Sequence, residues 1–345
     1  MSTETLSADF TVPTDWKPMP HTIIKDQSLK STIEEEGFAV VPFLDEAALL
    51  ELRAIYEKEH AITSDEGGMF YSLYSQNLDY RERVDKAVGG VMQPVLDQFF
   101  EKYKTVLNSF IIKIPGPKSG FLIHQDTTGL DERAYSSLSV WVPIWDIGPE
   151  DGAMCMVRRS HKMFYPYRGI SFAFPFEEIH GTVKQYLEPV YMKAGQAIIF
   201  DQRTLHASLP NTSGKNRVVV TSGLFPEEAK FQMCFREGPD APVEIYRQAD
   251  DFILKYPRFM HDCRTRPIAG EKIGEVDFPI PMMTAEEFHA KAKAAGLEPL
   301  HLVGDESTLG CNPMPEPDGV ERAPLAPLVI PKTEAELAAA SFQAE

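Results

Sequence analysis

Two side chains that can bind a metal, His124 and Asp126, lie two residues apart in the first half of the chain. They end an apolar stretch that begins at Phe121, and positions two apart on a β-strand point to the same face. The imidazole and the carboxylate should therefore converge on one point. His206 lies in a later stretch that can run alongside and supply a third ligand. Two imidazoles and one carboxylate leave coordination positions open, which suits ferrous iron that also takes a bidentate keto acid and dioxygen.

The His-x-Asp pair alone is weak evidence, because nine histidines and 51 acidic residues produce such pairs by chance. Without further context, a salt-bridged surface pair is the better interpretation. Arg217 supplies that context. It opens an apolar strand soon after His206, and its planar guanidinium suits the far carboxylate of a keto acid that chelates iron. The turn at 209–214 predicts that the two strands pair as a hairpin, which would bring His206 and Arg217 close together. The alternative for Arg217 is a surface arginine at the start of a strand.

Hydrophobic periodicity predicts the elements that position these residues. Many short strands bounded by Gly, Pro and Asn are typical of an antiparallel sandwich or barrel. Helical spacing appears before and after the strands, and Thr284 begins a capping-box sequence. The fold class is therefore mainly β with flanking helices (α+β). Strands are expected from 36, from 106, and over 121–126, 136–147, 153–158, 197–201, 205–209 and 217–225. Helices are expected after Asp45, over 82–104 with a kink at Pro94, over 243–260 and over 285–295.

Composition shifts along the chain suggest four parts. Residues 1–20 form a flexible N-terminal arm, and 21–260 form the main domain with helices before its strands. Residues 261–303 form a helical C-terminal extension. Residues 304–345 are rich in proline and form an extended tail.

The overall charge limits the classes of partner. A formal charge of -17 repels nucleic acid and anionic lipid, so neither is an expected partner. Four cysteines without a C-x-x-C pair are typical of reduced thiols in the cytosol. The N-terminus lacks the basic and apolar regions of a secretory signal, so a cytoplasmic location is expected. The sequence leaves the oligomeric state open.

Four segments, taken in order, resemble the phytanoyl-CoA dioxygenase-like family of iron(II)- and 2-oxoglutarate-dependent enzymes. The resemblance covers about residues 34–226. The segments are 36–44, the His-Gln-Asp at 124–126, the run from Trp141 to His161, and 195–217. The resemblance implies a double-stranded β-helix (jelly-roll, cupin-like) core. It implies Fe(II) on His124, Asp126 and His206, and 2-oxoglutarate on Arg217. It also implies a hydroxyl contact from Ser208 to the same carboxylate, with Trp141 lining the cosubstrate pocket.

The substrate is less well defined. The family usually has Pro-Gly before Ser-His, whereas this chain has Arg158 and Arg159. We therefore expect a small, polar, anionic substrate held by one of the two arginines, since neighbouring strand positions point to opposite sides. The alternative is that both are solvated. Phe121 and Trp145 are the other substrate candidates.

The carboxylate of Asp126 also bears on the reaction type. Related halogenases have Gly or Ala at this position, so hydroxylation, desaturation or ring formation is expected here instead of halogenation. Two other classes stay open: a metal-binding cupin-like barrel with non-oxidative chemistry, and a non-catalytic binding module. The Arg217 position argues against the first, and the complete triad against the second.

Overall fold

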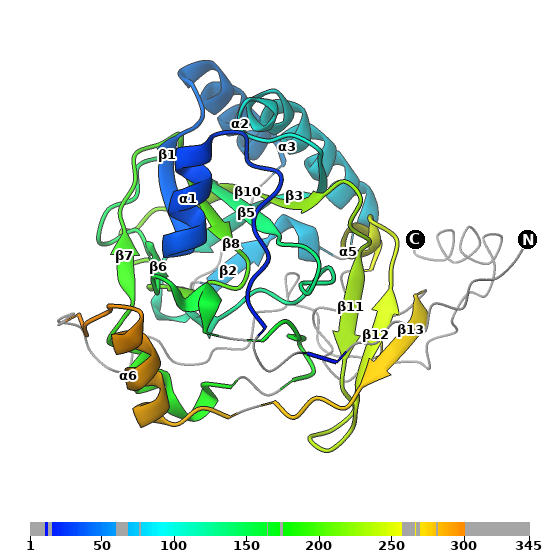
Figure 1. Cartoon of the computed structure of the whole chain (residues 1–345). Coiled ribbons are helices and arrows are strands. Elements are labelled where there is room, and N and C mark those ends of the chain that lie inside the picture. The colour runs from blue at the N-terminus through cyan, green and yellow to red at the C-terminus, as the bar shows by residue number, and fades with distance from the viewer. Residues whose placement is uncertain are drawn as a thin grey trace, which may run out of the picture.

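Two antiparallel β-sheets lie face to face in the computed structural model, and helices cover their outer faces (Figure 1). The structure describes residues 11–12, 16–59, 68–75, 77–163, 165–172, 175–256, 266, 270–280 and 282–300. The expected tail over 304–345, and most of the expected arm over 1–20, lie outside these residues. Within the described part, no helix combines the length and the apolar character that a membrane span needs.

The two sheets have the topology of a double-stranded β-helix. From β3 onward the chain alternates between the sheets, except that β6 and β7 are both in the smaller one. The jelly-roll prediction is confirmed, as an open sandwich of two sheets. In order across the large sheet, the strands are β1 (Phe38–Pro42), β8 (Gln196–Asp201), β5 (Leu138–Pro143), β10 (Arg217–Pro226), β3 (Tyr103–Ile114) and β2 (Gly68–Tyr71). The small sheet runs β4 (Phe121–His124), β9 (His206–Ser208), β6 (Met154–Met156) and β7 (Glu188–Val190).

This topology shows that the predicted hairpin between the strands of His206 and Arg217 is wrong. Strand β9 pairs with β4 and β6 in the small sheet, whereas β10 pairs with β3 and β5 in the large sheet. The turn at 209–214 therefore crosses between the sheets. His206 and Arg217 still face the same interior, but from opposite sheets.

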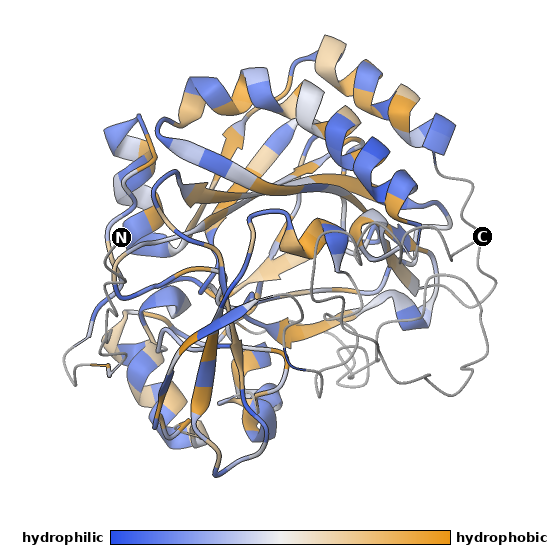
Figure 2. Cartoon of the chain, turned by 90° about the vertical axis from the view of Figure 1, so that its right-hand side faces the viewer, coloured by the Kyte–Doolittle hydropathy of each residue, from blue (hydrophilic) through white to orange (hydrophobic). Residues whose placement is uncertain are grey.

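A helical layer covers the outer face of the large sheet (Figure 2). It comprises α1 (Gln27–Glu36), α2 (Glu46–Glu59) and α3 (Leu78–Phe99). Helix α3 buries Val84, Val88 and Leu96, which belong to the same apolar core as Phe110 and Val220 of the sheet. The helices expected near 46 and 82 are confirmed, and Pro94 lies within α3. Helix α1 was not anticipated.

The outer face of the small sheet is covered by α4 (His180–Lys184) and α6 (Ala285–Ala294). Phe288 of α6 and Ile123 and Cys155 of the sheet share one buried core. The capping box expected at Thr284 is present, because the Thr284 hydroxyl accepts from the Glu287 amide and the Glu287 carboxylate accepts from the Thr284 amide. Both sheets thus have a sealed outer face, and what remains is the space between them.

A third sheet flanks one end of the sandwich. It contains β11 (Gln232–Phe235), β12 (Val243–Arg247) and β13 (Glu271–Val276). The short helix α5 (Phe252–Lys255) comes between β12 and β13 in the chain. The prediction of a helix over 243–260 is therefore wrong for residues 243–247, which form β12. Val243 and Ile245 are buried at a spacing of two, which a paired strand satisfies. The extension expected to be helical over 261–303 contains a strand as well as α6. Short 3-10 turns occur at Ser72–Tyr74, Pro117–Ser119, Ser160–Lys162 and Glu177–Ile179.

Candidate metal centre

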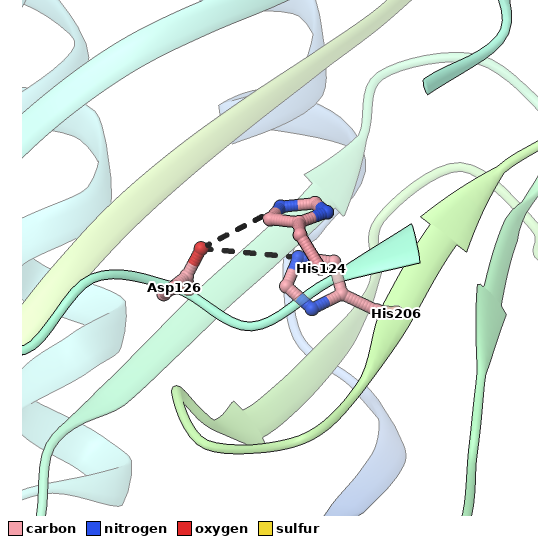
Figure 3. Close-up of side chains that lie close together, drawn as sticks. All are labelled: His124, Asp126 and His206. Carbon is pink, nitrogen blue, oxygen red and sulfur yellow. Dashed lines mark ion pairs between the residues drawn. The ribbon is translucent and has the colours of Figure 1, made fainter. Parts of the chain in front are cut away.

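The two histidines and the aspartate meet between the sheets. Asp126 Oδ1 lies 3.9 Å from His124 Nε2 and 3.8 Å from His206 Nε2. Figure 3 shows the carboxylate and the two imidazoles pointing toward one another. His124 and His206 are paired residues of neighbouring strands, and their ring centroids lie 4.0 Å apart. One ligand atom from each residue lies within 4.8 Å of the others, which a single ion can bridge.

Backbone hydrogen bonds set the tautomer of both histidines. His124 Nδ1 lies 3.0 Å from the Leu122 carbonyl oxygen, and His206 Nδ1 lies 2.9 Å from the Thr204 carbonyl oxygen. Because a carbonyl only accepts, each Nδ1 carries a proton, and in the neutral ring Nε2 is then the nitrogen with the free lone pair. Burial, together with His206, holds the pKa of His124 well below its usual value and favours the neutral ring. These are the protonation states that metal ligation requires.

The aspartate is oriented by its neighbours. The Ser139 hydroxyl of β5 donates to the Asp126 carboxylate, with Oγ 3.3 Å from Oδ2. The Asp126 amide donates to the Gln202 carbonyl, and Arg168 Nε donates to the Asp126 carbonyl at 2.8 Å. Arg168 is itself fixed by a buried bidentate pair with Glu132, at 2.6 and 2.7 Å. Two oriented imidazoles and one carboxylate on one side of an ion fit Fe(II), because the opposite side stays open.

The triad faces a cavity of about 360 Å³ between the two sheets. The predicted residues Phe121, Trp141, Ser208 and Arg217 all line it. The Arg217 guanidinium lies 5.1 Å from the Trp141 ring centroid, so the indole forms one wall beside the cation. Phe121 meets the His124 ring edge-on with centroids 4.7 Å apart.

Arg217 is 5% exposed and only partly satisfied. One guanidinium nitrogen donates to the Gly152 carbonyl at 3.1 Å, while Nε is buried without a partner. Burial lowers the pKa of Arg217 to about 10, so the side chain stays charged at neutral pH. A buried charge with an unmet donor is costly, and a carboxylate ligand would satisfy it.

A second buried cation, Lys113, was missed by sequence reasoning. It pairs directly with Arg217 across β3 and β10, and it is 0% exposed. Its Nζ donates to Ser208 Oγ at 2.7 Å and to the Leu209 carbonyl. Burial, and then the neighbouring Arg217, lower the pKa of Lys113 well below its usual value. The available signal was a lysine inside an apolar strand, between Ile112 and Ile114.

Two tyrosines that sequence reasoning did not single out, Tyr71 and Tyr74, also line the cavity. Their ring centroids lie 5.0 Å apart, and burial raises the pKa of both hydroxyls. They stay neutral and can act only as hydrogen-bonding groups. Nothing in the local sequence distinguishes them from core aromatics.

Trp145 does not reach the cavity, which corrects its expected substrate role. Strand β5 ends at Pro143, so the alternation that points Trp141 inward does not continue to residue 145. The Trp145 ring packs edge-on against Tyr56 of α2, with centroids 5.6 Å apart, and lies beside Arg53. It belongs to the helix-facing core.

Arg158 and Arg159 also lie outside the cavity, because β6 ends at Met156 and the chain then turns away. Arg158 makes a bidentate pair with Glu188, at 2.6 and 2.9 Å. Arg159 donates to Glu36 at 2.6 Å and to the Ala295 carbonyl at 2.6 Å. The structure therefore contradicts the prediction that one of them anchors an anionic substrate. They instead join β7, α1 and the end of α6.

Comparison with known proteins gives a sequence match to one family. The family model "Phytanoyl-CoA dioxygenase" matches residues 33–219, more than half of the 345-residue chain. A curated relative, "Phytanoyl-CoA dioxygenase domain-containing protein 1" from Danio rerio, is 28% identical over 130 residues. That alignment covers 34% of this chain and 44% of the relative, so the chain spans less than half of the relative's length.

Solved structures show more distant likenesses. The carbocyclase SnoK from nogalamycin biosynthesis is 20% identical with a TM-score of 0.45, over 60% of this chain and 86% of that chain. HygX from Streptomyces hygroscopicus, solved with nickel, 2-oxoglutarate and hygromycin B, is 15% identical with a TM-score of 0.42. That match covers 59% of this chain and 88% of HygX.

Proposed function

The chain belongs to the phytanoyl-CoA dioxygenase family, and from that premise we propose that it is an Fe(II)- and 2-oxoglutarate-dependent dioxygenase acting on a small molecule. The observation that carries the proposal is that one cavity holds both an open-sided triad and a buried cation with an unmet donor. The triad supplies the ligands for iron, and Arg217 supplies the partner for the far carboxylate of the keto acid.

Each polar group of the site has a separable task in this proposal. His124, Asp126 and His206 hold Fe(II), with each Nδ1 bonded to a backbone carbonyl so that each Nε2 is left for the metal. Arg217 binds the far carboxylate of 2-oxoglutarate, and the Ser208 hydroxyl is free to donate to the same group because it accepts from Lys113. Trp141 fixes the plane of the Arg217 guanidinium from one side.

Bound iron with 2-oxoglutarate and dioxygen supplies the oxidising chemistry. One oxygen atom enters the succinate formed when 2-oxoglutarate loses CO2, and the other enters a C–H bond of the substrate as a hydroxyl group. The chain contributes by orienting the cosubstrate and by keeping the site within apolar walls. The Asp126 carboxylate occupies the position that a halide would need, so hydroxylation is proposed in preference to halogenation. Desaturation and ring closure use the same residues.

The test is to load purified protein with Fe(II) and measure succinate released from 2-oxoglutarate under air. We expect one ferrous ion per chain and slow release without substrate. Asp126→Ala should lose iron binding and release, while circular dichroism stays unchanged because a single side chain leaves a large core. Asp146→Ala is the matched control, since that carboxylate pairs with Lys193 outside the cavity. Stoichiometric zinc that iron cannot replace, with no succinate formed, would exclude the proposal.

A further inference from the structure

The cavity has a charged end and an apolar end, and the apolar end defines a substrate class. We infer that the substrate is a compact, uncharged and mostly apolar molecule with one hydroxyl or carbonyl group that meets Ser109. This inference rests on the proposed function, because it assigns the charged end to 2-oxoglutarate.

Strand register separates the two ends. Arg217 is paired with Lys113 at one end of β10, and further along the same strand Thr221 is paired with Ser109 and Gly223 with Leu107. Side chains two apart on a strand share a face, so these positions all point inward with Arg217. The cosubstrate therefore occupies the region of Arg217 and Lys113. The substrate occupies the region beyond Thr221.

The walls beyond Thr221 are apolar. Among the described residues that line the cavity, the only basic side chain other than the histidines is Arg217, and the only acidic one is Asp126. Both are engaged by the cosubstrate and the metal. An anionic substrate at the far end would have no counter-charge, and an unpaired buried charge is strongly disfavoured. The far end is lined by Val106, Leu107, Phe225, Phe231, Met233 and Ile253.

One polar group in this region lacks a partner. Ser109 is 1% exposed, and its Oγ makes no hydrogen bond in the structure. Buried hydroxyls are almost always paired, so an unpaired one that lines a cavity points to a ligand group that completes it. A substrate hydroxyl or carbonyl can do this, because a serine hydroxyl both donates and accepts.

The volume limits the size of the substrate. A cavity of about 360 Å³ lies near the lower limit of small-molecule sites, and it must hold 2-oxoglutarate as well. A molecule with one or two rings, or a short branched chain, suits the remaining space. This class replaces the anionic substrate that the sequence suggested.

Three probes with one skeleton separate charge from hydrogen bonding: 2-naphthylmethanol, 2-methylnaphthalene and 2-naphthoate. Binding is measured by saturation-transfer NMR on protein holding Zn(II) and saturating 2-oxoglutarate, so that Arg217 is occupied. We expect 2-naphthylmethanol to bind, and 2-naphthoate to bind at least roughly tenfold more weakly. Ser109→Ala should weaken 2-naphthylmethanol about three- to tenfold and leave 2-methylnaphthalene unchanged.

Ser222→Ala is the matched control. Ser222 is on the same strand pair but on the opposite face, where its hydroxyl donates to Asn108 at 2.7 Å, so all three affinities should be unchanged. Stronger binding of 2-naphthoate, an unchanged affinity in Ser109→Ala, or no binding of 2-naphthylmethanol would each overturn the inference. Binding of 2-oxoglutarate is measured in the same samples. If 2-oxoglutarate binds and one of the three contrary outcomes appears, only the substrate class is wrong. If 2-oxoglutarate does not bind, the proposed function is wrong.

Discussion

Arg217 and Lys113 place two buried basic side chains side by side, across one strand pair, with no acidic side chain bonded to either among the described contacts. Such an arrangement is unfavourable in the folded protein until an anion arrives. The proposed cosubstrate supplies that anion. Binding of this anion should therefore also stabilise the folded protein around Arg217 and Lys113.

Arg217→Ala should weaken 2-oxoglutarate and spare the metal. The lost partner is a buried guanidinium facing a carboxylate, for which the expected cost is roughly 2–5 kcal/mol. Calorimetric titration of 2-oxoglutarate into the Zn(II)-loaded variant measures this, with metal content checked separately. Arg158→Ala removes an arginine that pairs with Glu188 outside the cavity and should change neither value. An unchanged 2-oxoglutarate affinity in Arg217→Ala would transfer the role to another cation.

Lys113→Met should remove a pH dependence of stability. Because the pKa of Lys113 is lower in the folded chain than in the unfolded chain, the unfolded chain binds more protons at pH values between the two. The free energy of unfolding of the wild type should therefore rise from pH 7 to pH 9, and rise less in Lys113→Met. Urea unfolding at the two pH values measures the difference. An equal pH dependence of the free energy of unfolding in the wild type and in Lys113→Met would contradict this prediction.

The sequence predicted most of the residues of the candidate site, and its failures have physical causes. His124, Asp126 and Arg217 could be found because a side chain that binds metal or carboxylate is unusual within or directly after an apolar run. Lys113 meets the same criterion and was overlooked. Arg158 and Arg159 were misassigned, because a strand pattern does not show where the strand ends and the chain turns away.

At the scale of elements, a buried histidine fixes the junction of α1, β1 and the 3-10 turn at Ser160–Lys162. The His161 ring packs against Gly37, the cap of α1, where φ is +88° and an added Cβ would come within 2.7 Å of His161 Nδ1. His161 Nε2 donates to the Glu34 carbonyl at 3.1 Å. Burial lowers the pKa of His161 to about 4, although Asp201 opposes the shift. The junction therefore requires a neutral imidazole.

His161→Gln should reduce acid sensitivity. The folded pKa of about 4 lies below the unfolded value of about 6.5, so the unfolded chain gains a proton first as the pH falls. The wild type should lose roughly 2–3 kcal/mol of stability from this group between pH 6.5 and pH 4. The variant should lack that part of the slope in chemical unfolding. His289→Gln, a half-buried histidine of α6 that interacts with Tyr186, is the comparison; a wild-type slope in His161→Gln would contradict the assignment.

Element boundaries were predictable where one face of a strand is buried and less so elsewhere. The apolar run from Phe121 located the strand of His124, but that strand ends at His124 and Asp126 lies in the segment that follows it. The capping-box sequence located α6. The hairpin was wrong because turn residues specify a reversal of the chain but not which sheet the next strand enters. The segment at 243–247 was assigned to a helix because its apolar spacing suits both periods, and pairing with β11 and β13 decides it.

At the scale of the whole molecule, the candidate metal site lies between two sheets whose outer faces are covered by helices (Figures 1 and 2). Ligands that bind only the folded chain raise its stability by mass action. Zn(II) and 2-oxoglutarate, each at about 100 times its dissociation constant, should together raise the free energy of unfolding by roughly 5 kcal/mol. Thermal unfolding measures this. The effect of 2-oxoglutarate should be absent in Arg217→Ala, and a full effect in that variant would place its binding elsewhere.

Part of the apolar end of the cavity comes from a stretch of the chain that follows all the residues of the charged end. The family match ends at residue 219, and the triad and Arg217 all precede that point. Phe225, Phe231, Met233 and Ile253, which line the apolar end, all follow it. Val106, Leu107 and Ser109 of β3 also line this end, so only part of the substrate wall lies outside the family match. A different segment after residue 220 would therefore change four apolar lining residues and leave His124, Asp126, His206 and Arg217 in place.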